Sequence, residues 1–298
     1  MIDSELAGGF GIALLAAIAY DSGYALQAFE ARRAPIEQSM RPALLAHLVR
    51  RPIWLAAIGL AIVGWALQVL ALTKAPLTLV QPVLALGLFL LLGLGVRFLG
   101  EHVGRREWTA VAIIVVAVGL IAWAAPTEPG TVPRDAGLAV ALGLLGALTI
   151  APVAASMRGT PSVALLIAGA GAADGLAAFV TKIVSEEIES GTLLLAAIWG
   201  LAAGVGVLVG LLSESSALQR AAATKVAPTV LVLQIAIPVA LAPIVGGESW
   251  SGTPLGGAVL IGALVLLSVG VLLLAGSRAV SEVLAEPPAE DAAGTARA

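Results

Sequence analysis

Two aspartates interrupt otherwise apolar segments of this sequence. Asp21 lies inside segment 8–29 and Asp174 inside segment 161–184. A charge at the centre of a membrane helix costs at least about 2.5–3.5 kcal/mol, so such residues usually handle ions, protons or substrate. We therefore expect both aspartates on an ion or substrate pathway, on facing helices near the middle of the membrane. The structural alternative is that each one only hydrogen-bonds to a neighbouring helix.

Other polar side chains accompany the aspartates inside apolar helices. Asp21, Tyr24 and Gln27 follow one another at three-residue spacing and so share a helical stripe. A glutamine in an apolar helix must face protein or water. The further pathway candidates are Ser22, Tyr24, Gln27, Gln68, Gln81 and Gln234.

A second group of residues is expected to form hinges, gates or entry sites. A proline inside a helix leaves a carbonyl unpaired one turn earlier, and glycines allow helices to approach closely. The hinge or gate candidates are Pro82, Pro238, Gly23 and Gly175. Glu214, which is flanked by serines, is a candidate cytoplasmic entry site. For a divalent-cation substrate, Asp21 and Asp174 are the expected metal ligands.

The composition requires a membrane environment for these residues. Of 298 residues, 59% are hydrophobic and 12% are charged, against about 45–50% and about 25% in soluble domains. A membrane-spanning helix needs about 20 apolar residues. Seven uncharged runs reach that length, and the two aspartate-containing segments bring the expected number of membrane-spanning helices to nine. The seven runs are 52–73, 75–96, 108–127, 136–157, 190–213, 226–247 and 249–277.

The basic residues predict the orientation of the chain. If the arginine-rich loop 30–51 is cytoplasmic, thirteen of the 16 basic residues lie inside. Lys74, Arg134 and Lys182 then remain outside. The positive-inside rule therefore places the N-terminus outside and the C-terminus inside. Residues 42–49 are expected to form a short helix that lies on the membrane surface or inserts into it partly.

The two halves of the chain share a pattern. Asp21 and Asp174 are 153 positions apart, and so are Gln81 and Gln234. Further pairs in the same order are Ala75-Pro76 with Ala227-Pro228 and Gly100-Glu101 with Gly247-Glu248. Two four-helix units separated by one extra helix would be antiparallel, as in many secondary transporters. We thus expect an all-α integral membrane protein with an inverted 4+1+4 repeat: repeat 1–125, crossover helix 126–160, repeat 161–277 and a disordered cytoplasmic tail 278–298.

Short motifs carry a resemblance to a known superfamily. They are the stretch Ala75-Pro76-Leu77-Thr78-Leu79-Val80-Gln81-Pro82 up to Gly87, then Leu99-Gly100-Glu101, then Ala125-Pro126-Thr127-Glu128. The chain resembles the drug/metabolite transporter (EamA-like) superfamily, and within it the nine-helix NIPA-type magnesium transporters. It departs from these transporters at Trp65, where they carry a glutamate, and at Tyr20, where small multidrug resistance proteins carry one. A divalent cation such as magnesium and a small organic cation or metabolite therefore both remain open as the substrate.

These features predict a transporter and leave two other classes open. We expect a secondary transporter that works by alternating access on a divalent cation such as magnesium or on a small organic cation or metabolite. The alternatives are a proton-coupled exporter unrelated to magnesium and a non-transporting membrane scaffold. The chain has no Walker motif, no His-x-x-x-His and no Gly-x-Ser-x-Gly, so we expect no ATP-driven pumping, no enzymatic activity and no cofactor.

The same features predict the surroundings of the chain. A net charge of −3 without a polybasic patch argues against nucleic acid as a partner. The expected partners are the lipid bilayer and a small-molecule or ion substrate, with protons and a second copy of the chain as open cases. The expected location is a bacterial plasma membrane, which the chain crosses several times.

Overall fold

Helices are the main secondary structure in the described part of the chain. The computed structural model describes residues 4–72, 74, 77–126, 131–247 and 249–275, and among these residues there is no strand. Two 3-10 turns, η1 and η2, accompany the helices. In chain order the elements are α1 (Ser4–Ala31), η1 (Ile36–Gln38), α2 (Pro42–Leu48), α3 (Pro52–Leu72), α4 (Leu77–Phe98), α5 (Arg105–Ala124), α6 (Ala136–Ser156), α7 (Val163–Glu189), α8 (Leu193–Leu218), α9 (Ala223–Val245), η2 (Pro254–Gly257) and α10 (Ala258–Ala275).

Most of these helices are suited to cross a membrane. Within the described residues, seven are long and apolar enough to span, and the bent pair α2 and α3 makes an eighth if it is one span. The prediction of an all-helical, multi-pass membrane protein is therefore confirmed. The helix that completes the expected nine is α4, in which Val83–Phe98 forms a shorter apolar helix. Nine spans thus remain a prediction.

The outer surface of the bundle is apolar. Large hydrophobic side chains are exposed along α6, α8 and α10, among them Leu144, Leu194, Leu201 and Leu272. Soluble monomers rarely expose contiguous apolar patches larger than a few hundred Å². In a bilayer, by contrast, apolar side chains can face the hydrocarbon without cost, provided that the backbone groups are paired inside each helix. The exposed surface of these helices therefore suits lipid.

Local sequence signals set the helix ends. The Asp135 side chain accepts a hydrogen bond from Leu138 N at the start of α6, and Ser162 does the same for Leu165 N at the start of α7. After α4, Gly100 has φ +67°, and after α9, Gly247 has φ +69°. Glycine adopts this left-handed conformation without strain, which allows a helix to end in a sharp turn.

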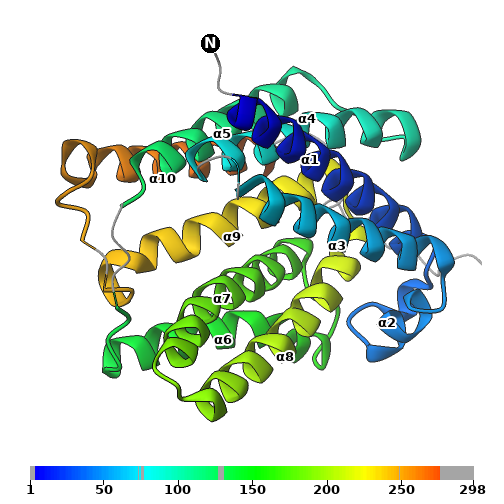
Figure 1. Cartoon of the computed structure of the whole chain (residues 1–298). Helices are drawn as coiled ribbons and strands as arrows, with labels where there is room; N and C mark the ends of the chain where they lie inside the picture. Colours follow the sequence, from blue (N-terminus) through cyan, green and yellow to red (C-terminus); the bar gives the residue numbers. More distant parts are fainter. Residues whose placement is uncertain (1–3, 73, 75–76, 127–130, 248, 276–298) are drawn as a thin grey trace, which may run out of the picture.

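The helices pack in two similar groups (Figure 1). In one group α1 lies against α3 and α4, and in the other α7 lies against α8 and α9. The α5 helix runs beside α10, the last helix of the described chain, and α6 packs mainly against α7. Figure 1 shows α9 between the α6–α8 group and the helices around α1 and α5. This arrangement brings residues of the first and second halves into contact along α1, α8 and α9.

The arginine-rich segment forms short elements between α1 and α3. The α2 helix has seven residues and meets α3 at an angle of 89°. Its Leu44 and Leu48 side chains are fully buried, and the helix packs against η1 and α8. The expected short helix at 42–49 is therefore present, anchored to the second half of the chain through two leucines. The predicted tail 278–298 lies outside the described residues.

Candidate functional site

A hydrogen bond joins two polar side chains from opposite halves of the chain. Tyr24 Oη of α1 donates to Glu214 Oε1 of α8 over 2.7 Å. Both residues lie in helices that are suited to span the membrane. Two buried serines, Ser213 and Ser215, flank Glu214 along α8. The structure thus places Glu214, predicted only as an entry site, in contact with the stripe of pathway candidates on α1.

Asp174 of α7 belongs to the same cluster. Its carboxyl group lies close to Gly210 of α8, one helical turn before Glu214. The close approach of α7 and α8 depends on Gly210, since a Cβ at that position would lie 2.6 Å from Ala173 Cβ and 3.9 Å from Asp174 Oδ1. We call Tyr24, Asp174 and Glu214 the acidic cluster.

Asp21 occupies a different contact from Asp174. Its side chain is buried between α1 and α4, where one carboxylate oxygen occupies the position that a Cβ on Gly87 would need. In the described part of the chain, Asp21 shares neither a hydrogen bond nor an ion pair with the acidic cluster. On α8, Glu214 lies one helical turn from the Gly210 position that Asp174 approaches, whereas Asp21 lies one helical turn from Tyr24 on α1.

The remaining pathway candidates have varied surroundings. Tyr20 Oη donates a hydrogen bond of 2.9 Å to Gln68 Oε1, which joins α1 to α3 within the first half. Ser22 and Gln27 are half-buried on α1, whereas Gln234 is exposed on α9. The side chains of Gln81 and Pro82 lie outside the described part of the chain.

The hinge or gate candidates lie at close helix contacts. A Cβ on Gly23 would lie 2.8 Å from the Ala57 carbonyl oxygen of α3, and a Cβ on Gly175 would lie 3.0 Å from Ile237 Cβ of α9. Both glycines therefore permit α1 and α7 to pack tightly against a neighbour. Pro238 stands half-buried inside α9, one residue after Ile237.

A buried ion pair ties the two halves together at one end of the bundle. Arg32, just after α1, pairs with Glu101, and it also donates to the carbonyls of Leu99 and Ala221. The Glu101 carboxylate accepts further hydrogen bonds from the Ala223 and Thr224 backbone N–H groups and from the Thr224 hydroxyl. Only 4% of the Glu101 side chain is exposed.

Glu101 therefore caps the N-terminus of α9 from the loop that follows α4. A carboxylate at this position satisfies backbone donors that have no partner within the helix and lies favourably in the helix dipole. This role of Glu101 cannot be predicted from the sequence, because a glutamate next to Gly100 resembles an ordinary solvated loop charge. No local signal points to its partner 122 residues later.

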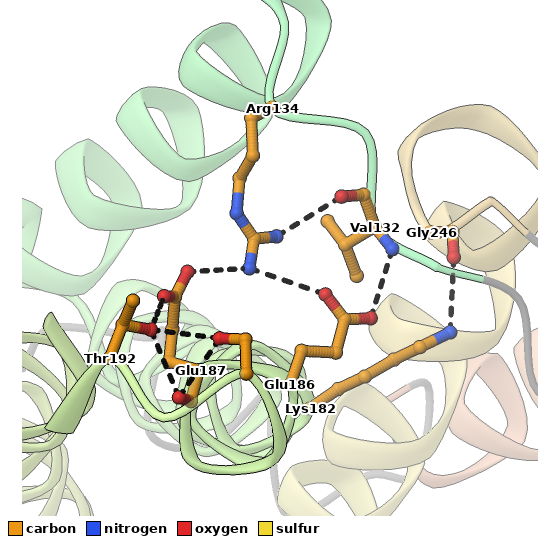
Figure 2. Close-up of polar contacts among 8 residues, drawn as sticks. Val132, Arg134, Lys182, Glu186, Glu187, Thr192 and Gly246 are labelled. Atoms are coloured by element: carbon orange, nitrogen blue, oxygen red, sulfur yellow. Dashed lines mark hydrogen bonds and ion pairs between the residues drawn. The ribbon is translucent and has the colours of Figure 1, made fainter.

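A second polar cluster connects elements around the C-terminal ends of α7 and α9 (Figure 2). Arg134 lies between Glu186 and Glu187, with distances of 3.2 Å and 2.9 Å to their carboxylate oxygens. Glu186 Oε1 accepts a hydrogen bond of 2.9 Å from Val132 N, and Lys182 Nζ donates one of 3.0 Å to the Gly246 carbonyl. These contacts fasten the segment before α6 and the end of α9 to α7.

The described residues contain no larger group of metal-ligating side chains. No group of three or more histidine, aspartate or glutamate side chains within them is placed to hold a metal ion. The acidic cluster offers two carboxylates and one phenol.

Comparison with known proteins gives one partial similarity. No protein-family model matches the chain, and no solved structure matches it. Over 91 residues the chain is 36% identical to an uncharacterized protein of Corynebacterium glutamicum. The match covers 30% of this chain and 32% of that protein, so the chain spans about a third of the length of the relative it matches.

Proposed function

We propose that this protein is a secondary transporter that carries a cation across the membrane by alternating access, with the acidic cluster as its binding site. The observation that carries the proposal is the hydrogen bond from Tyr24 to Glu214, between helices suited to span and one helical turn from the point where Asp174 approaches α8. Intramembrane carboxyl groups are costly and usually mark ion, proton or substrate pathways.

The chemistry of the cluster favours a positively charged substrate. Two neighbouring carboxylates in apolar surroundings repel each other, and a cation or a proton between them relieves that repulsion. Carboxylate oxygens suit a hard divalent ion, while an aromatic ring beside them suits an organic cation. Magnesium-like ions and small organic cations are therefore the two substrate classes to test.

Equivalent packing in the two halves supports the inverted repeat that alternating access uses. The α1 helix packs on α3 and α4 as α7 packs on α8 and α9. The left-handed glycines Gly100 and Gly247 end α4 and α9, which the repeat makes equivalent. Inverted repeats provide two interchangeable arrangements around a central site.

The clusters at the two ends of the bundle fit the two gates of such a cycle. The Arg32–Glu101 pair joins the end of α1 to the start of α9, and the Lys182–Gly246 contact joins α7 to the end of α9. Opening one end would require the polar contacts at that end to part while those at the other end hold. The proposed orientation places the Arg32–Glu101 end in the cytoplasm.

Flux into proteoliposomes tests this function. The purified full chain would be reconstituted and assayed with Mg²⁺ and, separately, with tetraphenylphosphonium, with and without a pH gradient. Glu214→Gln and Asp174→Asn are each expected to lower flux at least about tenfold, since each removes one charge from the site. Dependence on the pH gradient would identify the proton-coupled alternative.

A matched carboxylate-to-amide change controls for a general loss of structure. Asp135→Asn removes a carboxylate outside the acidic cluster, and asparagine still caps α6, so flux should stay unchanged. Wild-type flux in both Glu214→Gln and Asp174→Asn would remove the site from the proposal. No flux of either cation by the folded wild-type protein would favour the membrane scaffold.

A further inference from the structure

A polar cavity opens at the arginine-rich end of the bundle, away from the acidic cluster. It has a volume of about 410 Å³ and lies between η1, the end of α6, the α6–α7 connection and the α8–α9 connection. Cavities of roughly 300–1,000 Å³ are the usual size for small-ligand sites. Its polar lining consists of Glu37, Ser39, Arg41, Ser156, Thr160 and Arg220.

Two guanidinium groups give this cavity its character. Arg220 donates to the Pro161 carbonyl, and this bond fixes its side chain along the wall while other N–H donors stay available. Arg41 contributes a second guanidinium from the turn before α2, and its side chain has no hydrogen-bond partner in the described part of the chain. Planar guanidinium groups match phosphate oxygens in geometry and keep their charge at any physiological pH.

One residue in the wall of this cavity has an unpaired hydroxyl. Ser39 Oγ is shielded from solvent and finds no hydrogen-bond partner among the described residues. Buried polar atoms in native proteins are nearly always paired, but this hydroxyl has almost no surface that a water-sized group in the cavity could reach. The hydroxyl therefore does not itself indicate a ligand, and the two guanidinium groups carry the argument.

The position of the cavity favours a ligand from the membrane. Ile36, an exposed apolar residue, lines it, and Met157, which is 84% exposed, directly follows α6 beside it. This combination is complementary to a phospholipid: the apolar side chains match the acyl chains, and the guanidinium groups match the phosphate. Basic pockets between helices on the cytoplasmic side are known to hold phospholipid head groups.

We propose that this cavity binds a phosphate group, supplied by the head group of an anionic phospholipid. Arg41 and Arg220 hold the phosphate oxygens. Glu37 lines the same cavity and weakens the binding of an anion through repulsion. This site would tie η1, α6 and the α8–α9 connection together, and it does not depend on the transport proposed above.

Binding to the delipidated full chain tests the phosphate site. Phosphatidylglycerol retention would be titrated by native mass spectrometry, and inorganic phosphate would be titrated separately by its shift of the thermal unfolding midpoint. Arg41→Gln should weaken phosphatidylglycerol binding about tenfold, the loss expected for one charge-assisted hydrogen bond. Arg50→Gln removes a charge from the loop between α2 and α3 without lining the cavity, so it should bind as the wild type does.

Glu37→Gln and Arg41→Gln should change the affinity for phosphatidylglycerol in opposite directions. Glu37→Gln should bind phosphatidylglycerol several-fold more tightly, because it removes the negative charge. Arg220→Gln is a second weakening variant, and Arg41→Gln decides the outcome if Arg220→Gln fails to fold. If Arg41→Gln weakens the binding of inorganic phosphate but not of phosphatidylglycerol, the cavity is a phosphate site for a soluble ligand, and the lipid assignment is wrong. Equal affinities in Arg41→Gln and Arg50→Gln, or no binding of either probe, would overturn the proposal.

Discussion

Tyr24 and Glu214 are 190 residues apart in the chain, yet the phenol of the first donates a hydrogen bond of 2.7 Å to the carboxylate of the second. The bond links α1 to α8, one helical turn from the point where Asp174 of α7 approaches α8. The contact therefore joins the two halves of the chain at the proposed binding site. Substitution of either residue therefore tests the proposed mechanism directly.

We expect Tyr24→Phe to lower cation flux about tenfold while leaving the fold intact, because it removes only the hydroxyl. A hydrogen bond to a charged group contributes about 1.5–3 kcal/mol. If the hydroxyl acts through Glu214, the double variant Tyr24→Phe/Glu214→Gln should transport no worse than Glu214→Gln alone. Additive losses in this cycle would show that the two side chains act separately.

The Asp21 carboxylate and Gly87 make a second testable pair. Gly87→Ala places a methyl group where the Asp21 carboxylate lies, so it should destabilise the protein by about 1–3 kcal/mol, as overpacking does. Gly93→Ala on the same helix meets nothing within 4 Å and should be neutral or slightly stabilising. Thermal unfolding in detergent measures both variants. Recovery of stability in Asp21→Ala/Gly87→Ala would trace the effect to this contact, and equal midpoints for the two glycine variants would contradict it.

Glu101 should contribute more to stability than its place in a loop indicates. Glu101→Gln weakens the pair with Arg32 and leaves an amide N–H₂ facing the N-terminal donors of α9. We expect a loss of about 2–3 kcal/mol in the free energy of unfolding. Glu37→Gln, an exposed change at the same end of the bundle, should stay within about 0.5 kcal/mol. A Glu101→Gln protein as stable as Glu37→Gln would show that the capping contact contributes nothing.

The Arg134 cluster in Figure 2 should tolerate substitution better than Glu101 does. Arg134 is 39% exposed and its partners face solvent in part, so water screens these ion pairs. Arg134→Gln is therefore expected to cost no more than about 1 kcal/mol. Denaturant unfolding of the two variants side by side measures the difference. A larger loss for Arg134→Gln than for Glu101→Gln would reverse the order that burial predicts.

The orientation can be tested with single cysteines, since the natural chain has none. Met157→Cys lies in the α6–α7 connection and Ser251→Cys in the α9–α10 connection, both at exposed positions. With the N-terminus outside, a membrane-impermeant thiol reagent added to intact spheroplasts should label Ser251→Cys and spare Met157→Cys until the cells are lysed. The reverse pattern would invert the topology and place the phosphate cavity on the outer face.

The positions of the helices followed closely from the sequence, and the short helix at 42–49 did too. Uncharged runs such as 136–157 and 226–247 correspond within a few residues to α6 and α9, because an apolar segment of about 20 residues has few stable forms in lipid. Gly100 and Gly247 could likewise be identified as helix ends. These features depend on neighbouring residues alone.

The partners of the polar residues were decided by the tertiary structure. The sequence singled out Asp21 and Asp174 as costly in lipid, but spacing cannot tell which helices will face each other. Folding joined Glu214 to Tyr24, set Asp21 against Gly87, and brought Glu101 to the start of α9. Burial cost belongs to a single residue and can be read along the chain, whereas pairing depends on how several helices pack at once.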